Sequence, residues 1–150
     1  MIRYFAESVN ISFFKERRLF TKFLKQILAE YNYKPGDINY IFCNDEYLLS
    51  INKQYLNHDY YTDTISFSYN SENKINGDIF ISIDRVKENS VFFKTSFEDE
   101  LYRVMIHGFL HLLGYEDKST DEDTNEMIIL QEKLLMRFYS SRVSRETLES

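Results

Sequence analysis

The stretch HGFLHLLGYED, residues 107–117, holds two of the three histidines and two of the four glycines in this chain of 150 residues. On a helix, His107 and His111 are separated by about 40° of rotation and about 6 Å of rise, so both imidazoles leave the same face. Gly114 suits the left-handed conformation that ends a helix, after which the chain can bring Asp117 towards the same point. This pattern predicts a metal site formed by His107, His111 and Asp117.

Two imidazoles and one carboxylate form a known catalytic zinc set that leaves one coordination position open. Zinc lowers the pKa of a bound water from about 15.7 to about 7, and it neutralises charge on a phosphoryl or carbonyl oxygen. One zinc ion is therefore the predicted cofactor, and a metal-dependent hydrolase the predicted class of protein. In H-E-x-x-H metallopeptidases a glutamate beside the first histidine serves as general base. Gly108 occupies that position here, which disfavours a peptidase and leaves the base unassigned.

Hydrophobic periodicity predicts the elements that position these residues. Apolar residues at helical spacing, together with capping residues, indicate helices over 13–31, about ten residues ending at Tyr55, 85–93, the segment from Ser96 to Gly114, and a last helix that starts at Ser119 or Thr120. Strands are predicted over 2–9, 38–43, 63–69 and 77–84, with a turn at 33–36. The last two strands are expected to pair antiparallel because their connection is short.

This order of strands and helices predicts one α+β domain over residues 1–150, with a mixed sheet covered by helices. The single cysteine, Cys43, cannot form an internal disulfide, which favours a reducing cytoplasm. No stretch approaches the roughly 18 apolar residues that a membrane span requires, so we expect no membrane insertion.

Charge is distributed unevenly along the chain, whose net charge is −6. Residues 1–34 carry seven Lys and Arg against three acids, whereas the remainder carries 11 against 21. Four of the basic residues, Lys15, Arg18, Lys22 and Lys25, fall on the polar side of the predicted helix 13–31. They are the candidate RNA-binding residues, because affinity for RNA comes largely from phosphate contacts. The alternative is the solvated face of an ordinary amphipathic helix.

The motif H-G-x-L-H-L-x-G-Y followed by an acidic residue closely resembles the signature of the bacterial YbeY family of rRNA maturation factors. A second block, INKQYLNHDYYTDTISF at 51–67, is similar to another motif of that family, and Gly77-Asp78-Ile79 resembles the strand that follows it. The similarity spans about residues 37–135 in the same order.

The resemblance implies a zincin-like fold with the metal site at the end of a helix. It also implies a zinc-dependent endoribonuclease, specific for single-stranded RNA, that acts in 16S rRNA 3′-end maturation and ribosome quality control. The implied partners are the 16S rRNA precursor and the small ribosomal subunit.

Three positions depart from the family pattern. Asp117 stands where the family usually has a third histidine, Leu56 where it has an arginine, and Tyr61 where it has a proline. An arginine in a nuclease cleft would pair with phosphate, and the candidates to replace it are Arg103 and a basic residue of the first helix. A metal-stabilised module that binds RNA or the ribosome with little hydrolysis is therefore an alternative function, and a metallopeptidase a less favoured one.

Overall fold

The computed structural model describes residues 1–116 and 125–149, so the predicted ligand Asp117 lies outside the described residues. Within the described residues the chain forms four strands and five helices in the predicted order. The elements are β1 (Ile2–Ala6), α1 (Arg17–Glu30), β2 (Lys34–Cys43), α2 (Asp45–Leu56), β3 (Thr64–Ser68), β4 (Lys74–Ser82), α3 (Ile83–Phe93), α4 (Phe97–Leu112) and α5 (Glu126–Glu149). None of the described helices is long and apolar enough to cross a membrane.

The four strands form one mixed sheet in the order β1-β2-β4-β3. Strands β1, β2 and β4 are parallel, and β3 runs antiparallel to β4 with Ser66 opposite Ile79. The predicted α+β class, the mixed sheet and the antiparallel pair are thus confirmed. Strands β1 and β3 occupy opposite edges of the sheet, so that surfaces formed beside these two strands are separated by its full width.

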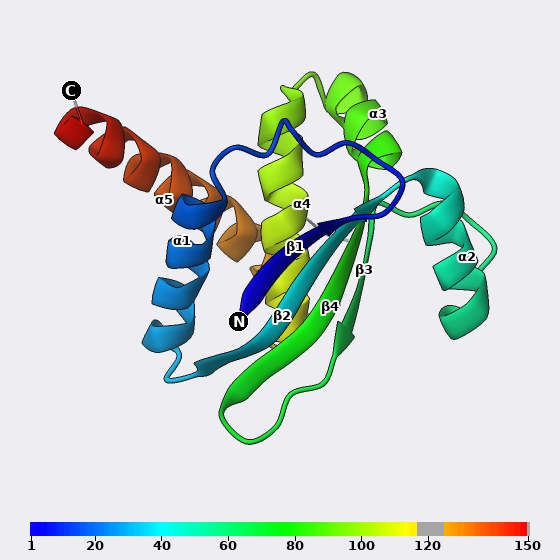
Figure 1. The fold of residues 1–150 in the computed structure, drawn as a ribbon, viewed down its shortest axis with the longest axis horizontal. Coiled ribbons are helices and arrows are strands. Elements are labelled where there is room, and N and C mark those ends of the chain that lie inside the picture. Colours follow the sequence, from blue (N-terminus) through cyan, green and yellow to red (C-terminus); the bar gives the residue numbers. More distant parts are fainter. Residues whose placement is uncertain (117–124, 150) are drawn as a thin grey trace.

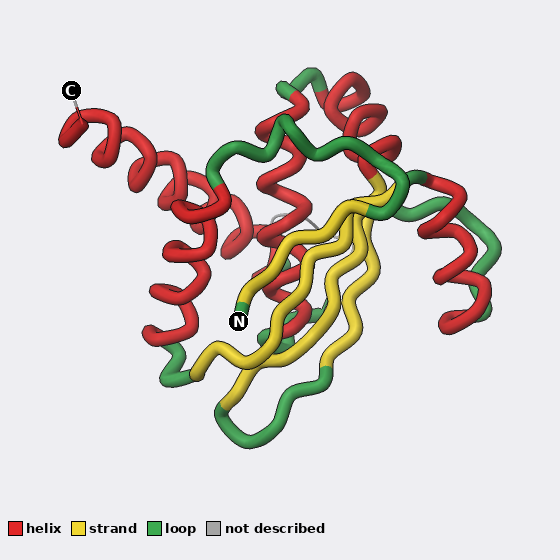
Figure 2. Tube along the Cα trace, in the orientation of Figure 1, coloured by secondary structure: helices red, strands yellow, loops and turns green. Residues whose placement is uncertain are grey.

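Helices cover the two faces of the sheet unequally. Helices α1, α4 and α5 enclose the main core on one face, and α4 lies behind the strands in Figure 1 with α1 and α5 beside it on the left. Helix α2, on the right of Figure 1, packs on β3 and β4 over a smaller cluster of Cys43, Leu48 and Ile65. The long connection between β1 and α1 is visible in Figure 2 and brings Phe13 against Phe97 at the start of α4, with ring centroids 5.0 Å apart.

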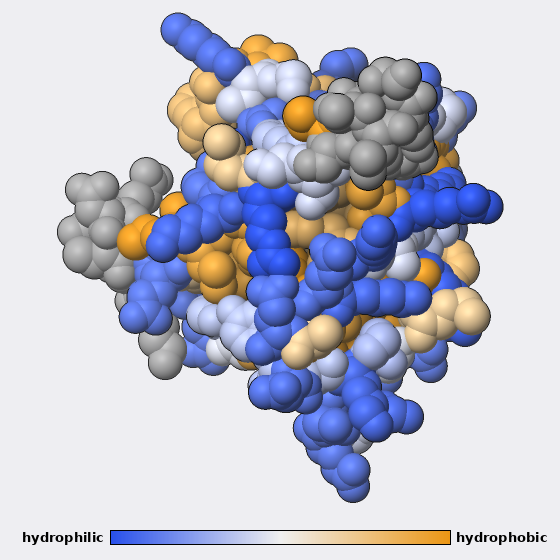
Figure 3. All heavy atoms as spheres, turned by 90° about the vertical axis from the view of Figure 1, so that its left-hand side faces the viewer, coloured by the Kyte–Doolittle hydropathy of each residue, from blue (hydrophilic) through white to orange (hydrophobic). Residues whose placement is uncertain are grey.

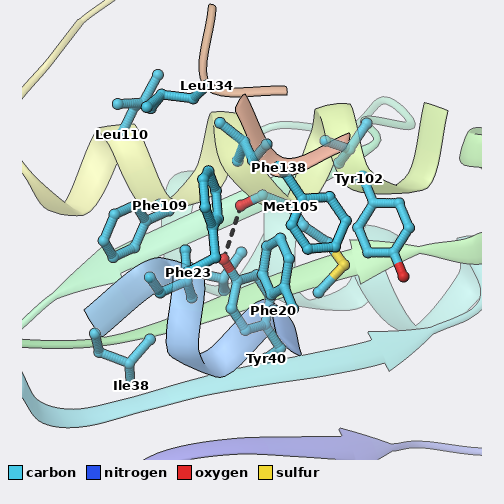
Figure 4. Close-up of a cluster of buried hydrophobic side chains, with 14 of the residues drawn as sticks. Phe20, Phe23, Ile38, Tyr40, Tyr102, Met105, Phe109, Leu110, Leu134 and Phe138 are labelled. Atoms are coloured by element: carbon cyan, nitrogen blue, oxygen red, sulfur yellow. Dashed lines mark hydrogen bonds between the residues drawn. The ribbon is translucent and has the colours of Figure 1, made fainter. Parts of the chain in front are cut away.

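Helix α4 is fixed to the centre of the sheet by a buried hydrogen bond. The Tyr40 hydroxyl of β2 donates to the carbonyl oxygen of Met105 at 2.8 Å, among the aromatic side chains in Figure 4. Burial raises the pKa of Tyr40 well above its usual range, so the hydroxyl remains a donor at any physiological pH. This contact holds α4 two residues before His107.

Some predicted boundaries are wrong, and β1 ends at Ala6 rather than at residue 9. The first helix begins at Arg17 rather than near residue 13, because Phe14 leaves the helical path to be buried against Tyr4. The predicted turn at 33–36 belongs to β2, where the irregular pairing between Pro35 and Ile38 accommodates the missing N–H of proline. The predicted start of the last helix at Ser119 or Thr120 lies outside the described residues; among these, α5 begins at Glu126, and the side chain of Asn125 accepts hydrogen bonds from the N–H groups of Met127 and Ile128.

Candidate active site

Local sequence signals define both ends of α4, the helix that carries the histidines. The Ser96 side chain accepts a hydrogen bond from the backbone N–H of Asp99 at 3.0 Å, as the capping pattern predicts. At the other end Gly114 has a φ of 100°, and the N–H of Tyr115 reaches back to the carbonyl of Leu110 at 3.1 Å. The predicted helix stop at Gly114 is therefore confirmed, and it turns the chain back over the last turn of the helix.

The structure brings the two predicted histidine ligands together. The Nε2 atoms of His107 and His111 lie 3.1 Å apart, and their ring planes are nearly perpendicular at 85°. Both side chains are half-buried. Among the described residues, no group of three His, Cys, Asp or Glu side chains is placed to hold a metal ion. The predicted third ligand, Asp117, is outside that set.

Hydrogen bonds on the far side of each ring set the tautomers of the two histidines. His111 Nδ1 lies 3.1 Å from the carbonyl oxygen of Tyr115, which can only accept, so this nitrogen carries the proton. His107 Nδ1 lies 2.6 Å from Oε1 of Gln131, and is likewise the donor. In neutral rings a protonated Nδ1 leaves Nε2 as the acceptor. This is the form in which histidine binds a metal through Nε2, and the two Nε2 atoms lie 3.1 Å apart.

Gln131 is itself oriented by a chain of charged groups. Its side chain is buried, and Nε2 donates to Glu132 Oε2 at 3.0 Å, which turns Oε1 towards His107. Glu132 accepts two hydrogen bonds from the Nε atom of Arg103 and one from its Nη2. With its amide nitrogen bound to Glu132, Gln131 can offer His107 only the acceptor Oε1. The Arg103–Glu132 ion pair thus places the proton of His107 on Nδ1 by orienting Gln131.

Arg103 is not placed to replace the missing family arginine. Besides Glu132 it binds Asp99 at 2.7 Å and Glu100 at 3.1 Å, so three carboxylates engage its guanidinium. It is also absent from the described residues that line the cleft beside the histidines. The expectation that Arg103 contacts phosphate is therefore not supported by its position.

Gly108, between the two histidines, faces the sheet rather than the site. A Cβ atom at this position would lie 2.6 Å from Cγ2 of Ile79 and 3.3 Å from the Ser66 hydroxyl. The Ser66 hydroxyl donates to the Gly108 carbonyl at 3.2 Å. Glycine at this position therefore allows α4 to approach β4 and β3 closely, and the contact excludes any larger residue here.

A cleft of about 390 Å³ opens beside His111. It lies between the end of α4, the edge strand β3 and the C-terminal part of α2. The described residues that line it are Asn52, Leu56, His58, Tyr60, Thr62, Thr64, Ile65, Ser66, His111, Gly114, Tyr115 and Glu116. None of them is a lysine or an arginine, so a phosphate group in this cleft would meet polar groups and the histidines but no cationic side chain of the described residues.

The sequence is similar to known proteins over most of its length. The model of the family described as endoribonuclease YbeY matches residues 2–139. The chain belongs to the YbeY family. Among curated relatives, the endoribonuclease YbeY of Parabacteroides distasonis is 47% identical over 121 residues, covering 81% of this chain and 84% of that protein. The endoribonuclease YbeY of Flavobacterium psychrophilum is 51% identical over 115 residues, covering 77% and 80%.

A solved structure agrees with this assignment. The solution structure of a protein from Thermotoga maritima aligns with a TM-score of 0.66 and 29% sequence identity, covering 100% of this chain and 97% of its own. The α+β architecture therefore recurs in an experimentally determined structure.

The YbeY motif at 51–67 supplies the cleft wall opposite the histidines. Leu56, at the position where the resemblance leads us to expect an arginine, lines the cleft and is 40% exposed. Asn52 of the same motif is buried and donates to the carbonyl of Tyr60 at 2.9 Å, which holds the following loop against α2. His58 stacks on Tyr60 with ring centroids 5.1 Å apart, and both rings line the cleft.

Sequence reasoning missed Gln131 and did not place His58 in the cleft. No spacing rule connects Gln131 to His107, since the contact depends on how α5 packs against α4. His58 had only its residue type as a signal, although it stands inside a block that resembles the YbeY motif. Glu116, the acid nearest to the predicted site in the sequence, lies at the cleft and is exposed.

The predicted RNA-binding residues lie away from this cleft. Arg18, Lys22 and Lys25 are exposed on α1 and line a groove against β1, at the opposite edge of the sheet from β3. Lys15 precedes the helix and does not line that groove. Of the four candidate RNA-binding residues, three, Arg18, Lys22 and Lys25, therefore share one face of α1.

Proposed function

We propose that this endoribonuclease of the YbeY family cleaves single-stranded RNA at the histidine cleft, with one zinc ion held by His107, His111 and Asp117. The observation that carries the proposal is the pair of Nε2 atoms that face each other with both Nδ1 atoms already committed as donors. Two imidazoles that direct their Nε2 atoms to one point, with Nδ1 held by other groups, have the arrangement in which histidines coordinate a single cation.

The distance between the two nitrogens fits zinc. At a Zn–N distance of about 2.05 Å and a tetrahedral angle, two nitrogen ligands are about 3.3 Å apart. The distance in the chain is 3.1 Å, so a small rotation of either ring would suffice. We include in the proposal the zincin-like classification that the family resemblance implies, with the metal site at the end of α4.

Bound zinc would supply a positive charge for a phosphoryl oxygen and a means of deprotonating water near neutral pH. The residues of the chain do the remaining work. Gln131 and the Tyr115 carbonyl hold the two rings in the required tautomer, and the Asn52–Tyr60 hydrogen bond keeps the cleft wall in place. The half-buried hydroxyls of Thr64 and Ser66 line the same cleft.

The biological setting in the proposal is that implied by the family: processing of the 16S rRNA precursor at its 3′ end, quality control of the small ribosomal subunit, and a cytoplasmic location. The support is the family assignment over residues 2–139. An RNA- or ribosome-binding module with little hydrolysis is the second candidate, favoured by the absence of Lys and Arg among the described residues of the cleft.

Chelation separates the two candidates. Cleavage of a fluorescently labelled single-stranded RNA by purified protein is expected to fall at least about 100-fold with excess chelator, because the metal contributes several kcal/mol to the transition state. Activity is expected to return on addition of zinc and to persist in a control with chelator presaturated with zinc. RNA that stays bound but uncleaved in the zinc-loaded protein would favour the binding module.

Gln131→Leu is expected to weaken zinc binding about 10- to 100-fold, because hydrogen bonds that orient histidine ligands contribute that much to affinity. Leucine fills similar space without an acceptor for His107 Nδ1. The measurement is zinc affinity by competition with a chromophoric chelator. Gln26→Leu, an exposed glutamine on α1, is the matched control, and equal zinc affinities in the two variants would contradict the role given to Gln131.

A further inference from the structure

A groove of about 430 Å³ runs between α1 and the edge strand β1. Its lining includes four cationic side chains, Arg17, Arg18, Lys22 and Lys25, together with Tyr4 and Thr21. We call it the α1 groove. None of the described acidic residues lines it. Helix α1 lies on the left of Figure 1, the side that faces the viewer in Figure 3, where hydrophilic side chains project over apolar ones.

None of the four cations of the α1 groove has a carboxylate partner among the described side chains. Among the described side chains, Arg17 and Arg18 are the arginines without an ion pair, and Lys22 and Lys25 form none either. Nearby acids are engaged elsewhere, since Glu30 pairs with Arg137 and Glu16 with Arg142 at 2.9 Å. The positive charge of the groove is therefore not neutralised within the described part of the chain.

The spacing of these cations suits an extended anion. Arg18, Lys22 and Lys25 follow one face of α1 over about 10 Å along its axis. Arg17 also borders a second hollow at the other end of β1, lined by the polar residues Ser8, Asn10 and Ser12. The cationic surface is thus continuous with hydroxyl and amide groups, the donors that nucleic-acid backbones contact besides lysine and arginine.

The α1 groove lies far from the histidine cleft, so it cannot bind the phosphate that is cleaved there. The two lie beyond opposite edges of the sheet, separated by at least three strand spacings, or about 14 Å. The described lining of the cleft has no lysine or arginine, whereas affinity for RNA requires phosphate contacts. An acidic enzyme of this kind needs its phosphate-binding surface outside the cleft.

We propose that the α1 groove is an RNA exosite, which binds phosphates of a single-stranded segment several nucleotides away from the cleaved bond. This inference rests on the proposed function for the identity of the RNA. Compared with the RNA-binding residues predicted from the sequence, the exosite contains Arg17 in place of Lys15. The groove is expected to contribute to affinity only when the RNA is long enough to reach both edges of the sheet.

The test compares Arg18→Glu/Lys22→Glu with a matched double charge reversal at α3, Lys87→Glu/Lys94→Glu. Binding of a labelled 30-nucleotide single strand and of a labelled tetranucleotide is measured by fluorescence anisotropy over a range of salt concentrations. All proteins carry His111→Ala, so the result does not depend on hydrolysis. Arg18→Gln/Lys22→Gln provides a milder variant, and circular dichroism establishes that each protein is folded.

The ratio of long-strand to short-strand affinity is expected to fall at least about tenfold in the α1 variant. The salt dependence is expected to decrease by about 0.7 for each phosphate that the variant no longer neutralises. The α3 control is expected to keep the ratio and salt dependence of the parent protein.

Two results would overturn the proposal. One is an unchanged ratio in the α1 variant, as expected if the groove binds an acidic protein instead. The other is an equal decrease of the ratio in the α3 control. Failure of RNA cleavage in the wild type would count against the proposed function but not against the exosite.

Discussion

Replacing His107 with alanine is expected to lower the rate of RNA cleavage by about three orders of magnitude while the protein remains folded. The substitution removes one of the two nitrogens that face each other at 3.1 Å, and loss of the ion forfeits several kcal/mol of transition-state stabilisation, at about tenfold for each 1.36 kcal/mol. The fold is expected to survive because the ring is only half-buried and lies at the border of the core.

Single-turnover cleavage of a labelled strand measures this effect separately from RNA binding. His111→Ala is expected to behave like His107→Ala. His58→Ala, which removes the remaining histidine of the chain from the same cleft, is expected to reduce the rate no more than about tenfold. Comparable reductions at all three histidines would indicate that the cleft works as a general polar surface rather than through a metal pair.

Gly108→Ala is expected to destabilise the protein by about 3 kcal/mol, although alanine is favoured over glycine in a helix by about 1 kcal/mol. The added methyl group would approach Cγ2 of Ile79 to 2.6 Å, and Ile79 is fully buried. A β-branched side chain in a packed core cannot rotate away, so α4 must move from the sheet, which is the cost of overpacking.

A double-mutant cycle with Ile79→Ala identifies the cause. Ile79→Ala alone is expected to cost about 2–5 kcal/mol by leaving a cavity, but the double variant should be more stable than the sum of the two single effects predicts, since each change relieves the other. Urea denaturation gives the four free energies of unfolding. If the effects simply add, or if Gly108→Ala is neutral, then α4 does not pack on β4 as described.

Much of the fold follows from local signals in the sequence. Ser96 and Gly114 predict the two ends of α4. The start of α2 has a local signal of the same kind, since the Asn44 side chain accepts a hydrogen bond from the N–H of Tyr47 at 2.8 Å. The alternation at 63–69 and the short connection to 77–84 predict the antiparallel pair. Each of these features depends on residues a few positions apart, which is the range over which capping and strand periodicity act.

Features that depend on packing between elements far apart in the sequence could not be predicted from local signals. Gln131 meets His107 only because α5 lies on α4, and Arg103 is engaged by Glu132 for the same reason. The order of strands placed Arg18 and Lys22 at the edge of the sheet opposite the cleft, which spacing along α1 does not reveal. The site was therefore predictable as a pair of histidines on a helix, but its supporting hydrogen bonds and the separate basic groove were not.

The zinc content of the purified protein, measured by elemental analysis beside that of His107→Ala, tests the central claim most directly. Both proteins are expressed in the same medium and dialysed against the same metal-free buffer. We expect one zinc ion per chain in the wild type and much less than one in the folded variant. Equal zinc content in the two folded proteins, or none in either after exposure to excess zinc, would contradict the claim that His107 and His111 hold a metal ion.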